Sequence, residues 1–219
     1  MTTQAGNLWD ERADAYRRSA THSAGPDLDR LVEWAGVGEG RHALDVATGG
    51  GHLARRLDDV GFVVTTIDQS PAMQPTIVSR AEDLPFADAT FDLVATRLAA
   101  HHFADVREAV GELARVSRDV VLVEDVLFMS DEVERAEMIR DPSHVKNYSA
   151  DEWRDLLSGA GLAVDEIVTM SRSMSYADWL ARCGCEGEDA ERCTELMGDR
   201  VTDGVLTLDY ILLKARRAG

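Results

Sequence analysis

A glycine-rich loop with acidic residues around it is the part of this sequence that could do chemistry. Three consecutive glycines, Gly49 to Gly51, follow the short apolar run 43–46 and precede a segment of helical periodicity. Glycines let a backbone approach a ligand closely, and the N-terminus of the following helix adds partial positive charge. Asp68 lies 17 residues beyond Gly51 at the end of the next β-type run, where a carboxylate can bind both hydroxyls of a ribose. The pattern predicts a site for a nucleoside-containing ligand.

The neighbouring residues bear on which nucleoside this is. The glycine spacing, together with Ala54, also fits a dinucleotide fingerprint, so a nicotinamide-dependent oxidoreductase is an alternative. Asp45 precedes the loop, where a carboxylate suits the ammonium of an amino acid and would repel a pyrophosphate. Asp83 and the Leu84 backbone follow the third β-type run and could bind the exocyclic amine of an adenine. A further alternative is that the glycines only form a tight turn and the acids are solvated caps.

The elements that must position these residues alternate between β-type runs and helices. We expect strands at residues 43–46, 62–67, 76–78, 91–96, 120–123, 162–168 and 205–213. Helices are expected at residues 53–60 and 106–116, after a capping box at Ser149, and as one stretch within 175–198. This alternation predicts an α/β fold with a doubly wound parallel sheet. Residues 127–148 follow the fifth strand at the ligand-binding edge of such a sheet, so this insert is expected to be a lid.

Composition and charge exclude several classes of function. The 219 residues are 45% hydrophobic and 29% charged, as in a globular protein with one core. With 23 Lys and Arg against 40 Asp and Glu, the net charge is −17, so neither nucleic acid nor a membrane is expected as a partner. No apolar run is long enough to span a bilayer, and residues 1–10 do not resemble a secretory signal. The three cysteines are an odd number without Cys-x-x-Cys spacing, which indicates reduced thiols in the cytoplasm and no metal site.

Four motifs together resemble those of the class I S-adenosylmethionine-dependent methyltransferases. They are ALDVATGGGH (43–52), IDQSPAM (67–73), AEDLPF (81–86) and FDLVATR (91–97). More narrowly, they are similar to the ubiquinone/menaquinone-biosynthesis-type branch, the type 11-like methyltransferases. We therefore expect a Rossmann-like sheet of seven strands in the order 3-2-1-4-5-7-6 with the last strand antiparallel. The single domain would span residues 1–219, with an N-terminal helical cap at residues 1–40.

The resemblance implies S-adenosylmethionine as cofactor and S-adenosylhomocysteine as product. The implied contacts are Asp45, Ala47, Gly49 and Gly51 at the methionine part, Asp68 at the ribose, Gln69 and Met73 beside the adenine, Asp83 and Leu84 at its edge, Arg97 below the sulfonium, and Tyr16 and His22 as a cover. This chain departs from the family after its second strand, where only residues 70–74 precede Pro75 and no full helix fits. The adenine face is therefore expected to be thinner than usual.

Two histidines are candidate catalytic residues. Methyl transfer from a sulfonium is an in-line displacement, so the protein mainly positions the nucleophile and excludes water. His102 follows the fourth strand and could take a proton from an enol, a phenol or an amine; alternatively it only packs or binds backbone. His144 in the insert could be oriented by Asp141, although this pair could equally anchor the lid. No metal is expected, because nothing in the histidine spacing demands one.

The sequence thus favours methyl transfer to an oxygen, nitrogen or carbon nucleophile of a small, partly apolar acceptor. Two alternatives remain besides the oxidoreductase: a non-methyl reaction such as a cyclisation in the same fold, and a non-catalytic ligand-binding protein. The protein is expected to be a monomer or a homodimer. The N-terminal segment around Tyr16 and His22 should meet the insert over the bound cofactor and exclude water.

Overall fold

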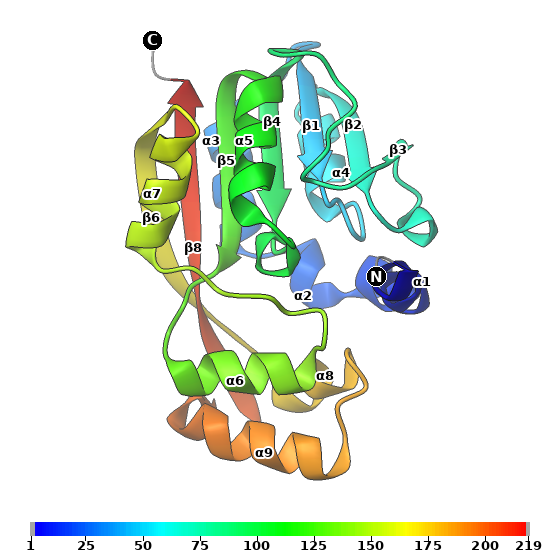
Figure 1. The fold of residues 1–219 in the computed structure, drawn as a ribbon, viewed down its shortest axis with the longest axis vertical. Helices are drawn as coiled ribbons and strands as arrows, with labels where there is room; N and C mark the ends of the chain where they lie inside the picture. The colour runs from blue at the N-terminus through cyan, green and yellow to red at the C-terminus, as the bar shows by residue number, and fades with distance from the viewer. Residues whose placement is uncertain (1–2, 218–219) are drawn as a thin grey trace.

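Alternating strands and helices build one twisted sheet with helices on both faces (Figure 1). The computed structural model describes residues 3–217, without the side chains of residues 3–7, 20 and 21. Residues 1–2 and 218–219 lie outside the described residues. They are the two ends of the predicted domain, and residues 1–2 are also the first two residues of the predicted cap. Within the described range, no helix combines the length and the apolar character needed to cross a membrane.

The strands follow the order β3-β2-β1-β4-β5-β8-β6, so the predicted order and the antiparallel last strand are confirmed. A two-residue strand that the sequence did not predict, β7, pairs with β8. The bounds are β1 (His42–Val46), β2 (Val63–Asp68), β3 (Ile77–Val78), β4 (Phe91–Arg97), β5 (Ser117–Val126), β6 (Leu162–Ser175), β7 (Val201–Thr202) and β8 (Val205–Arg217).

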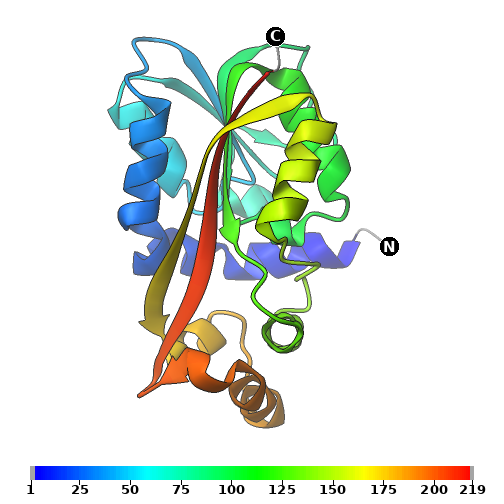
Figure 2. The same ribbon diagram turned by 90° about the vertical axis from the view of Figure 1, so that its left-hand side faces the viewer.

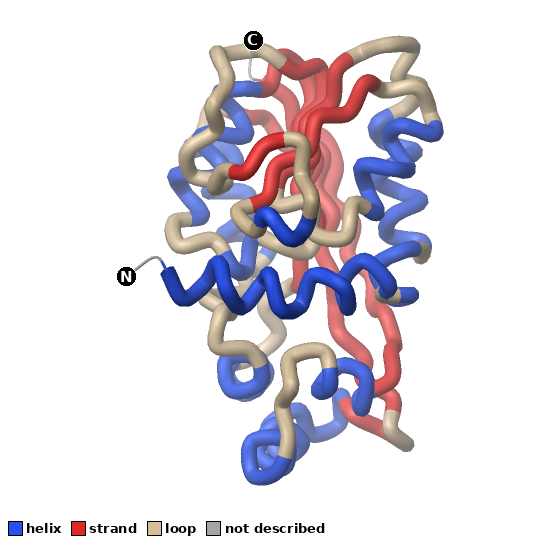
Figure 3. Tube along the Cα trace, turned by 90° about the vertical axis from the view of Figure 1, so that its right-hand side faces the viewer, coloured by secondary structure: helices blue, strands red, loops and turns tan. Residues whose placement is uncertain are grey.

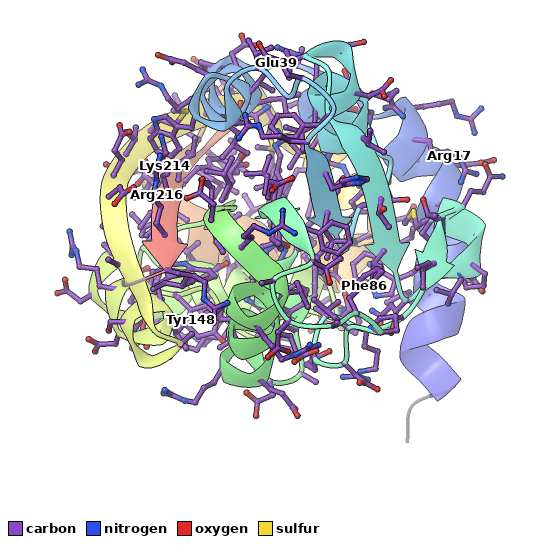
Figure 4. All side chains as sticks on the ribbon, turned by 90° about the horizontal axis from the view of Figure 1, so that it is seen from above. Arg17, Glu39, Phe86, Tyr148, Lys214 and Arg216 are labelled. Carbon is purple, nitrogen blue, oxygen red and sulfur yellow. The ribbon has the colours of Figure 1, made fainter. Side chains whose placement is uncertain are left out.

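Two pairs of helices cover the two faces of the sheet (Figure 2). Leu28 and Leu57, from α3 (Pro26–Ala35) and α4 (His52–Asp59), pack on one face. Trp153, from α7 (Ala150–Gly159), packs beside α5 (Val106–Val116) on the other face. Figure 4 shows Phe86 and Tyr148 on the α5 side and Glu39 on the opposite side. Because both faces are covered, the central strands read as continuous apolar runs.

The remaining helices lie at the carboxyl edge of the sheet and beyond it. They are α1 (Thr3–Arg18), α2 (Ala20–Ser23), α6 (Asp131–Arg140), α8 (Tyr176–Ala181), α9 (Gly187–Met197) and the 3-10 turns η1 (Pro71–Met73), η2 (Ala100–His102) and η3 (Gly198–Arg200). Strands β6 and β8 run past the sheet to carry α8 and α9, and α6 packs against α9 (Figure 1). The single helical stretch predicted within 175–198 is therefore two helices, separated by a turn in which Gly184 has a φ of +68°.

The insert 127–148 leaves the sheet and returns to the same point. Leu127 and Tyr148 form an isolated parallel bridge, and the Phe128 N–H donates to the Tyr148 carbonyl over 3.1 Å. Helix α6 forms the body of the loop that this bridge closes. The insert is thus a closed loop that begins and ends beside the carboxyl end of β5.

Helix α1 covers the face that the short turn after β2 leaves thin. The turn η1 replaces the full helix of the family, as predicted. Trp9 and Ala13 of α1 pack on Met73 of this turn, and α1 crosses in front of the sheet edge (Figure 3). The face that was expected to be thin is therefore covered by an element from the N-terminus.

The capping box of α7 gives a test of the local sequence signal. The Ser149 hydroxyl accepts from the Glu152 N–H, and the Glu152 carboxylate accepts from the Ser149 N–H. Ser149→Ala should lower the free energy of unfolding in urea by about 1 kcal/mol, because a helix N-terminal N–H loses its partner. Ser158→Ala, on the exposed side of the same helix, is the control and should change stability little. Equal effects of the two substitutions would contradict the role given to the cap.

Candidate active site

A cavity of about 340 Å³ lies where β1, β2 and β4 end. The sheet order reverses between β1 and β4, the place at which open α/β sheets bind ligands. The register brings Asp45, Thr66 and Ala95 side by side, so the loops after the three strands open into the same space. Helix α1, the turn η2 and the insert complete its walls.

Most of the predicted site residues meet in this cavity. Those that line it are Tyr16, His22, Asp45, Ala47, Gly49, Asp68, Gln69, Met73, Arg97 and His102. Four predicted residues do not line it: Gly51, Asp83, Leu84 and His144. The lining residues that the sequence reasoning missed are Trp9, Thr48, Gly50, His52, Leu53, Ser79, Arg80, Ala81, Glu82, Leu98, Ala99, Phe103, Ala104, Pro142, Ser143 and Val145.

A different structural constraint favours glycine at each of the three positions in the loop after β1. Gly49 has a φ of +51°, and its N–H donates to Asp68 Oδ2 over 2.9 Å. A Cβ on Gly50 would lie 2.7 Å from the Tyr16 carbonyl oxygen and 2.8 Å from His52 Nε2, so only glycine fits beneath α1. Gly51 has a φ of +70° as the N-cap of α4, which shapes the loop without facing the cavity. Gly50 was not among the predicted site residues, although its place in a run of three glycines could have identified it.

Asp68 offers two carboxylate oxygens that are held in place but not saturated. Oδ1 accepts from the Ser70 N–H and Oδ2 from the Gly49 N–H, both over 2.9 Å. Burial raises the pKa of Asp68 above its ordinary value, although these backbone bonds oppose the change. Each oxygen can accept further hydrogen bonds, so the carboxylate can hold two neighbouring hydroxyls.

Asp45 is a buried carboxylate without an ion-pair partner among residues 3–217. Thr48 Oγ1 donates to its Oδ2 over 2.6 Å. Burial raises the pKa of Asp45 to about 6, against the hydrogen bonds from Thr48 and the Ala54 N–H. A buried carboxylate of this kind is stabilised by a cation, and an ammonium group of a ligand would supply one.

The structure corrects the predicted contacts at the adenine edge. Asp83 is exposed and lies outside the cavity lining. The Leu84 N–H is already used, because it donates to Glu112 Oε2 over 2.8 Å. Ala81 and Glu82, the first two residues of the same motif, line the cavity instead. The motif thus reaches the cavity through its first two residues and not through Asp83 or Leu84, whose N–H is bound by α5.

Arg97 forms the base of the cavity wall and is bound on three sides. Its Nε donates to Glu124 Oε2 over 2.7 Å, its Nη1 to the His22 carbonyl over 2.9 Å, and its Nη2 to Asp27 Oδ2 over 2.5 Å. Arg172 of β6 donates to the same Asp27 oxygen over 2.7 Å. Burial raises the pKa of Glu124 to about 8, with the attraction of Arg97 opposing it. The guanidinium therefore ties the N-terminal cap to the sheet beneath the cavity.

The N-terminal cover is held down by α4. His52 Nε2 lies 2.9 Å from the Tyr16 carbonyl and Arg55 lies 2.7 Å from His52 Nδ1, so His52 donates through Nε2 and accepts at Nδ1. Ser19 Oγ lies 2.7 Å from His22 Nδ1 and fixes that ring. Burial raises the pKa of Tyr16 to about 12, which keeps the phenol protonated at neutral pH.

The cover and the insert meet through one buried ion pair. Arg12 Nη1 lies 3.0 Å from both carboxylate oxygens of Asp141. Ser143 Oγ and Cys183 Sγ also donate to this carboxylate, over 2.6 and 3.3 Å. The N-terminal segment and the insert thus meet, but through Arg12 and not through the predicted region of Tyr16 and His22, and Cys183 in the turn after α8 takes part.

His144 is not placed for catalysis, and its predicted pairing with Asp141 is wrong. Its Nε2 lies 2.9 Å from Glu134 Oε1 and its Nδ1 3.4 Å from Glu137 Oε2, both on α6. Asp141 turns toward Arg12, whose guanidinium supplies the full positive charge that a buried carboxylate needs. The predicted alternative, an anchor of the lid to the body, describes Asp141, which binds Arg12 of α1, whereas the partners of His144 lie within the insert.

His102 lines the cavity beside the insert. Its Nδ1 lies 3.1 Å from the Ser143 carbonyl, and its ring packs on Trp9 with centroids 4.7 Å apart. Because a carbonyl only accepts, Nδ1 carries the hydrogen and Nε2 is left with its lone pair. The lining there is largely apolar, since Phe103, Pro142 and Val145 also contribute to it.

Comparisons with known proteins agree with this geometry. Residues 44–123 match a family model described as a methyltransferase domain. The uncharacterized methyltransferase YcgJ of Bacillus subtilis is 30% identical over 197 residues, which are 80% of this chain and 78% of that protein. The uncharacterized protein YafE of Escherichia coli is 38% identical over 155 residues, covering 63% of this chain and 75% of that one. The crystal structure of YcgJ superposes with a TM-score of 0.80 at 26% identity, covering 88% of this chain and 99% of its own. The chain therefore belongs to the class I S-adenosylmethionine-dependent methyltransferases.

Proposed function

We propose that this enzyme transfers the methyl group of S-adenosylmethionine to an oxygen, nitrogen or carbon nucleophile of a small, partly apolar acceptor. The observation that carries the proposal is that one cavity contains both Asp45 and Asp68, suited to the cofactor, and His102 in an apolar wall. Membership of the family counts against the nicotinamide-dependent oxidoreductase. The narrower ubiquinone/menaquinone-type branch stays a prediction.

The residues present fit the cofactor. Asp68 would hold the ribose hydroxyls, Asp45 the ammonium of the methionine part, and α1 with Met73 would cover the adenine. The bound cofactor supplies a methyl group on a positively charged sulfur, which leaves with the S–C bond electrons and becomes the thioether of S-adenosylhomocysteine. A volume of about 340 Å³ is at the lower end for ligand sites, so the space left for the acceptor is small.

The chain's own residues do three things in this reaction. The cover and the insert, joined by Arg12 and Asp141, exclude water from the cavity. The apolar wall of Trp9 and Val145 orients the acceptor. Where the acceptor nucleophile carries a proton, His102 Nε2 accepts it as the new bond to the methyl carbon forms. The acidic surface of the chain makes nucleic acids and anionic membranes unsuitable acceptors.

Cofactor affinity tests the role of Asp68. Asp68→Ala should weaken the binding of S-adenosylhomocysteine by roughly 1.5–3 kcal/mol, about 10- to 100-fold, because hydrogen bonds to a charged group are lost. Isothermal titration calorimetry measures this change. Asp83→Ala removes the same chemical group from an exposed position outside the cavity and should bind like the parent protein. The assignment would be overturned if both variants bound equally well.

The dependence of affinity on pH tests the role of Asp45. The pKa of about 6 means that Asp45 must lose a proton before it pairs with the ligand ammonium at lower pH. Affinity for S-adenosylhomocysteine should be level above about pH 7 and fall toward tenfold per pH unit below pH 6. In Asp45→Asn the affinity should be lower and this component of the pH dependence should disappear. An unchanged pH dependence in that variant would rule out the pairing.

Transfer of a labelled methyl group tests the reaction itself. The protein is incubated with methyl-labelled S-adenosylmethionine and a panel of small phenols, enols, amines and carboxylic acids, and label in each acceptor is counted. With an acceptor that carries a proton, His102→Gln should lower kcat by 100-fold or more with cofactor affinity unchanged, as loss of a general base does. His144→Gln, a change of the same size outside the cavity, should affect kcat much less. Binding without transfer to any acceptor would favour the non-methyl alternatives.

A further inference from the structure

Three histidines gather at the acceptor end of the cavity, but only one of them faces it. His101 and His102 belong to η2, and His144 belongs to the insert. The ring centroid of His101 lies 4.0 Å from that of His102 and 5.5 Å from that of His144. Of the three, only His102 lines the cavity. The mechanism proposed above gives no role to His101.

His101 is held by a buried carboxylate at the end of β5. Its Nδ1 lies 2.5 Å from Asp125 Oδ1, and its backbone N–H donates to Asp125 Oδ2 over 2.8 Å. Asp125 is 1% exposed, and among residues 3–217 its salt-bridge partner is His101. A buried carboxylate is costly without a cation beside it, so this contact favours the protonated form of the His101 ring.

The hydrogen-bond partner of His102, in contrast, is not a carboxylate. Its Nδ1 donates to the Ser143 carbonyl, which carries no full charge and therefore favours the protonated ring less than a carboxylate would. A second positive charge on His102 would face the charged ring of His101, with 4.0 Å between the centroids. Two adjacent imidazoles therefore have different partners, a carboxylate for one and a carbonyl for the other.

We propose that His101, held by Asp125, is a positioning residue that keeps His102 in its neutral form with Nε2 free to accept a proton from the acceptor. The proposal rests on the proposed function in one respect, namely that His102 is the proton acceptor. The division of charge between the two rings stands on their contacts alone. His101 also positions the insert, because its carbonyl accepts from the Val145 N–H over 2.8 Å.

Charged groups on β5 and α6 agree with this division, and one on the insert opposes it. Asp125 of β5 and Glu137 of α6 act on His101, and their attraction, with that of Asp141, raises its pKa although burial alone would lower it. Burial and then the charge of His101 lower the pKa of His102 well below its ordinary value, with a smaller effect of His144 in the same direction.

Asp141 of the insert is the acid that opposes this effect on His102, together with the Ser143 carbonyl. Its attraction is limited because Arg12 of α1 pairs with it. On the side of α1, the group against His102 is the Trp9 ring, which carries no charge. The surroundings thus leave His101 as the nearest cation and no free carboxylate beside His102.

Titration of the histidine rings by NMR in the full chain tests the proposal. The His102 resonance is identified as the one absent from His102→Gln. In the parent protein this ring should stay neutral from pH 8 down to pH 6. In His101→Gln, which keeps an N–H donor for Asp125, the His102 midpoint should rise by about one pH unit or more, because the neighbouring charge is gone. Asp125→Asn should move it in the same direction, because His101 then loses the partner that keeps it protonated.

A control separates this effect from a general loosening of the site. His144→Gln removes another ring, 6.3 Å from His102, and should move the His102 midpoint less than His101→Gln does. An unmoved midpoint in both His101→Gln and Asp125→Asn, or an ordinary midpoint in the parent protein, would overturn the proposal. Circular dichroism verifies the fold of each variant, and where only one of the two informative variants folds, that variant decides the outcome.

The NMR titration tests the role of His101, and the methyl-transfer assay tests the proposed function, so the two proposals can fail independently. If no acceptor is methylated but the His102 midpoint moves as expected, the proposed function is at fault and the control of His102 by His101 stands. If an acceptor is methylated, the acidic limb of kcat against pH should move upward in His101→Gln by the same amount as the NMR midpoint. A shifted midpoint with an unshifted limb would show that His102 is not the base.

Discussion

The hydrogen bonds of the Arg97 guanidinium are the interactions on which the rest of the site depends. They join β4 to Glu124 of β5, to Asp27 of α3 and to the backbone of His22, segments that lie far apart in the sequence. The three side chains are buried, and removing Arg97 or Asp27 would leave buried charge without its partner, at a cost of about 3–5 kcal/mol. The floor of the cavity and the start of its cover are therefore fixed together.

The roof of the cavity depends on two further contacts of the same kind. His52 holds the end of α1 through the Tyr16 carbonyl, and Arg12 holds its middle through Asp141 of the insert. Helix α1 thereby takes the place of the helix that is missing after β2 and packs its Trp9 against His102. One N-terminal helix thus covers both ends of the cavity, so that movement of this helix would open the two ends together.

The lining near Asp45 and Asp68 differs in its electrostatics from the lining near His102, and this difference fits the proposed binding of two ligands in one cavity. The end near Asp45 and Asp68 carries buried carboxylates that suit an ammonium and hydroxyl groups. The end near His102 carries a ring with a lowered pKa in an apolar wall. A cationic ligand is favoured at the first end, and a neutral, partly apolar one at the second.

The sequence by itself determined what depends on neighbours along the chain: the succession of strands and helices, the capping box at Ser149 and the glycine loop, while its resemblance to the methyltransferase family supplied the strand order. Periodicity, capping and left-handed backbone are local properties, and chain-wide connection rules convert them into a sheet. Only the tertiary structure decided which distant groups pair. It gave the Leu84 N–H to Glu112, and it gave Asp141 to Arg12 rather than to His144. The physical reason is that a buried polar group takes whichever partner the packing of other elements brings within hydrogen-bonding distance, and spacing along one chain does not carry that information.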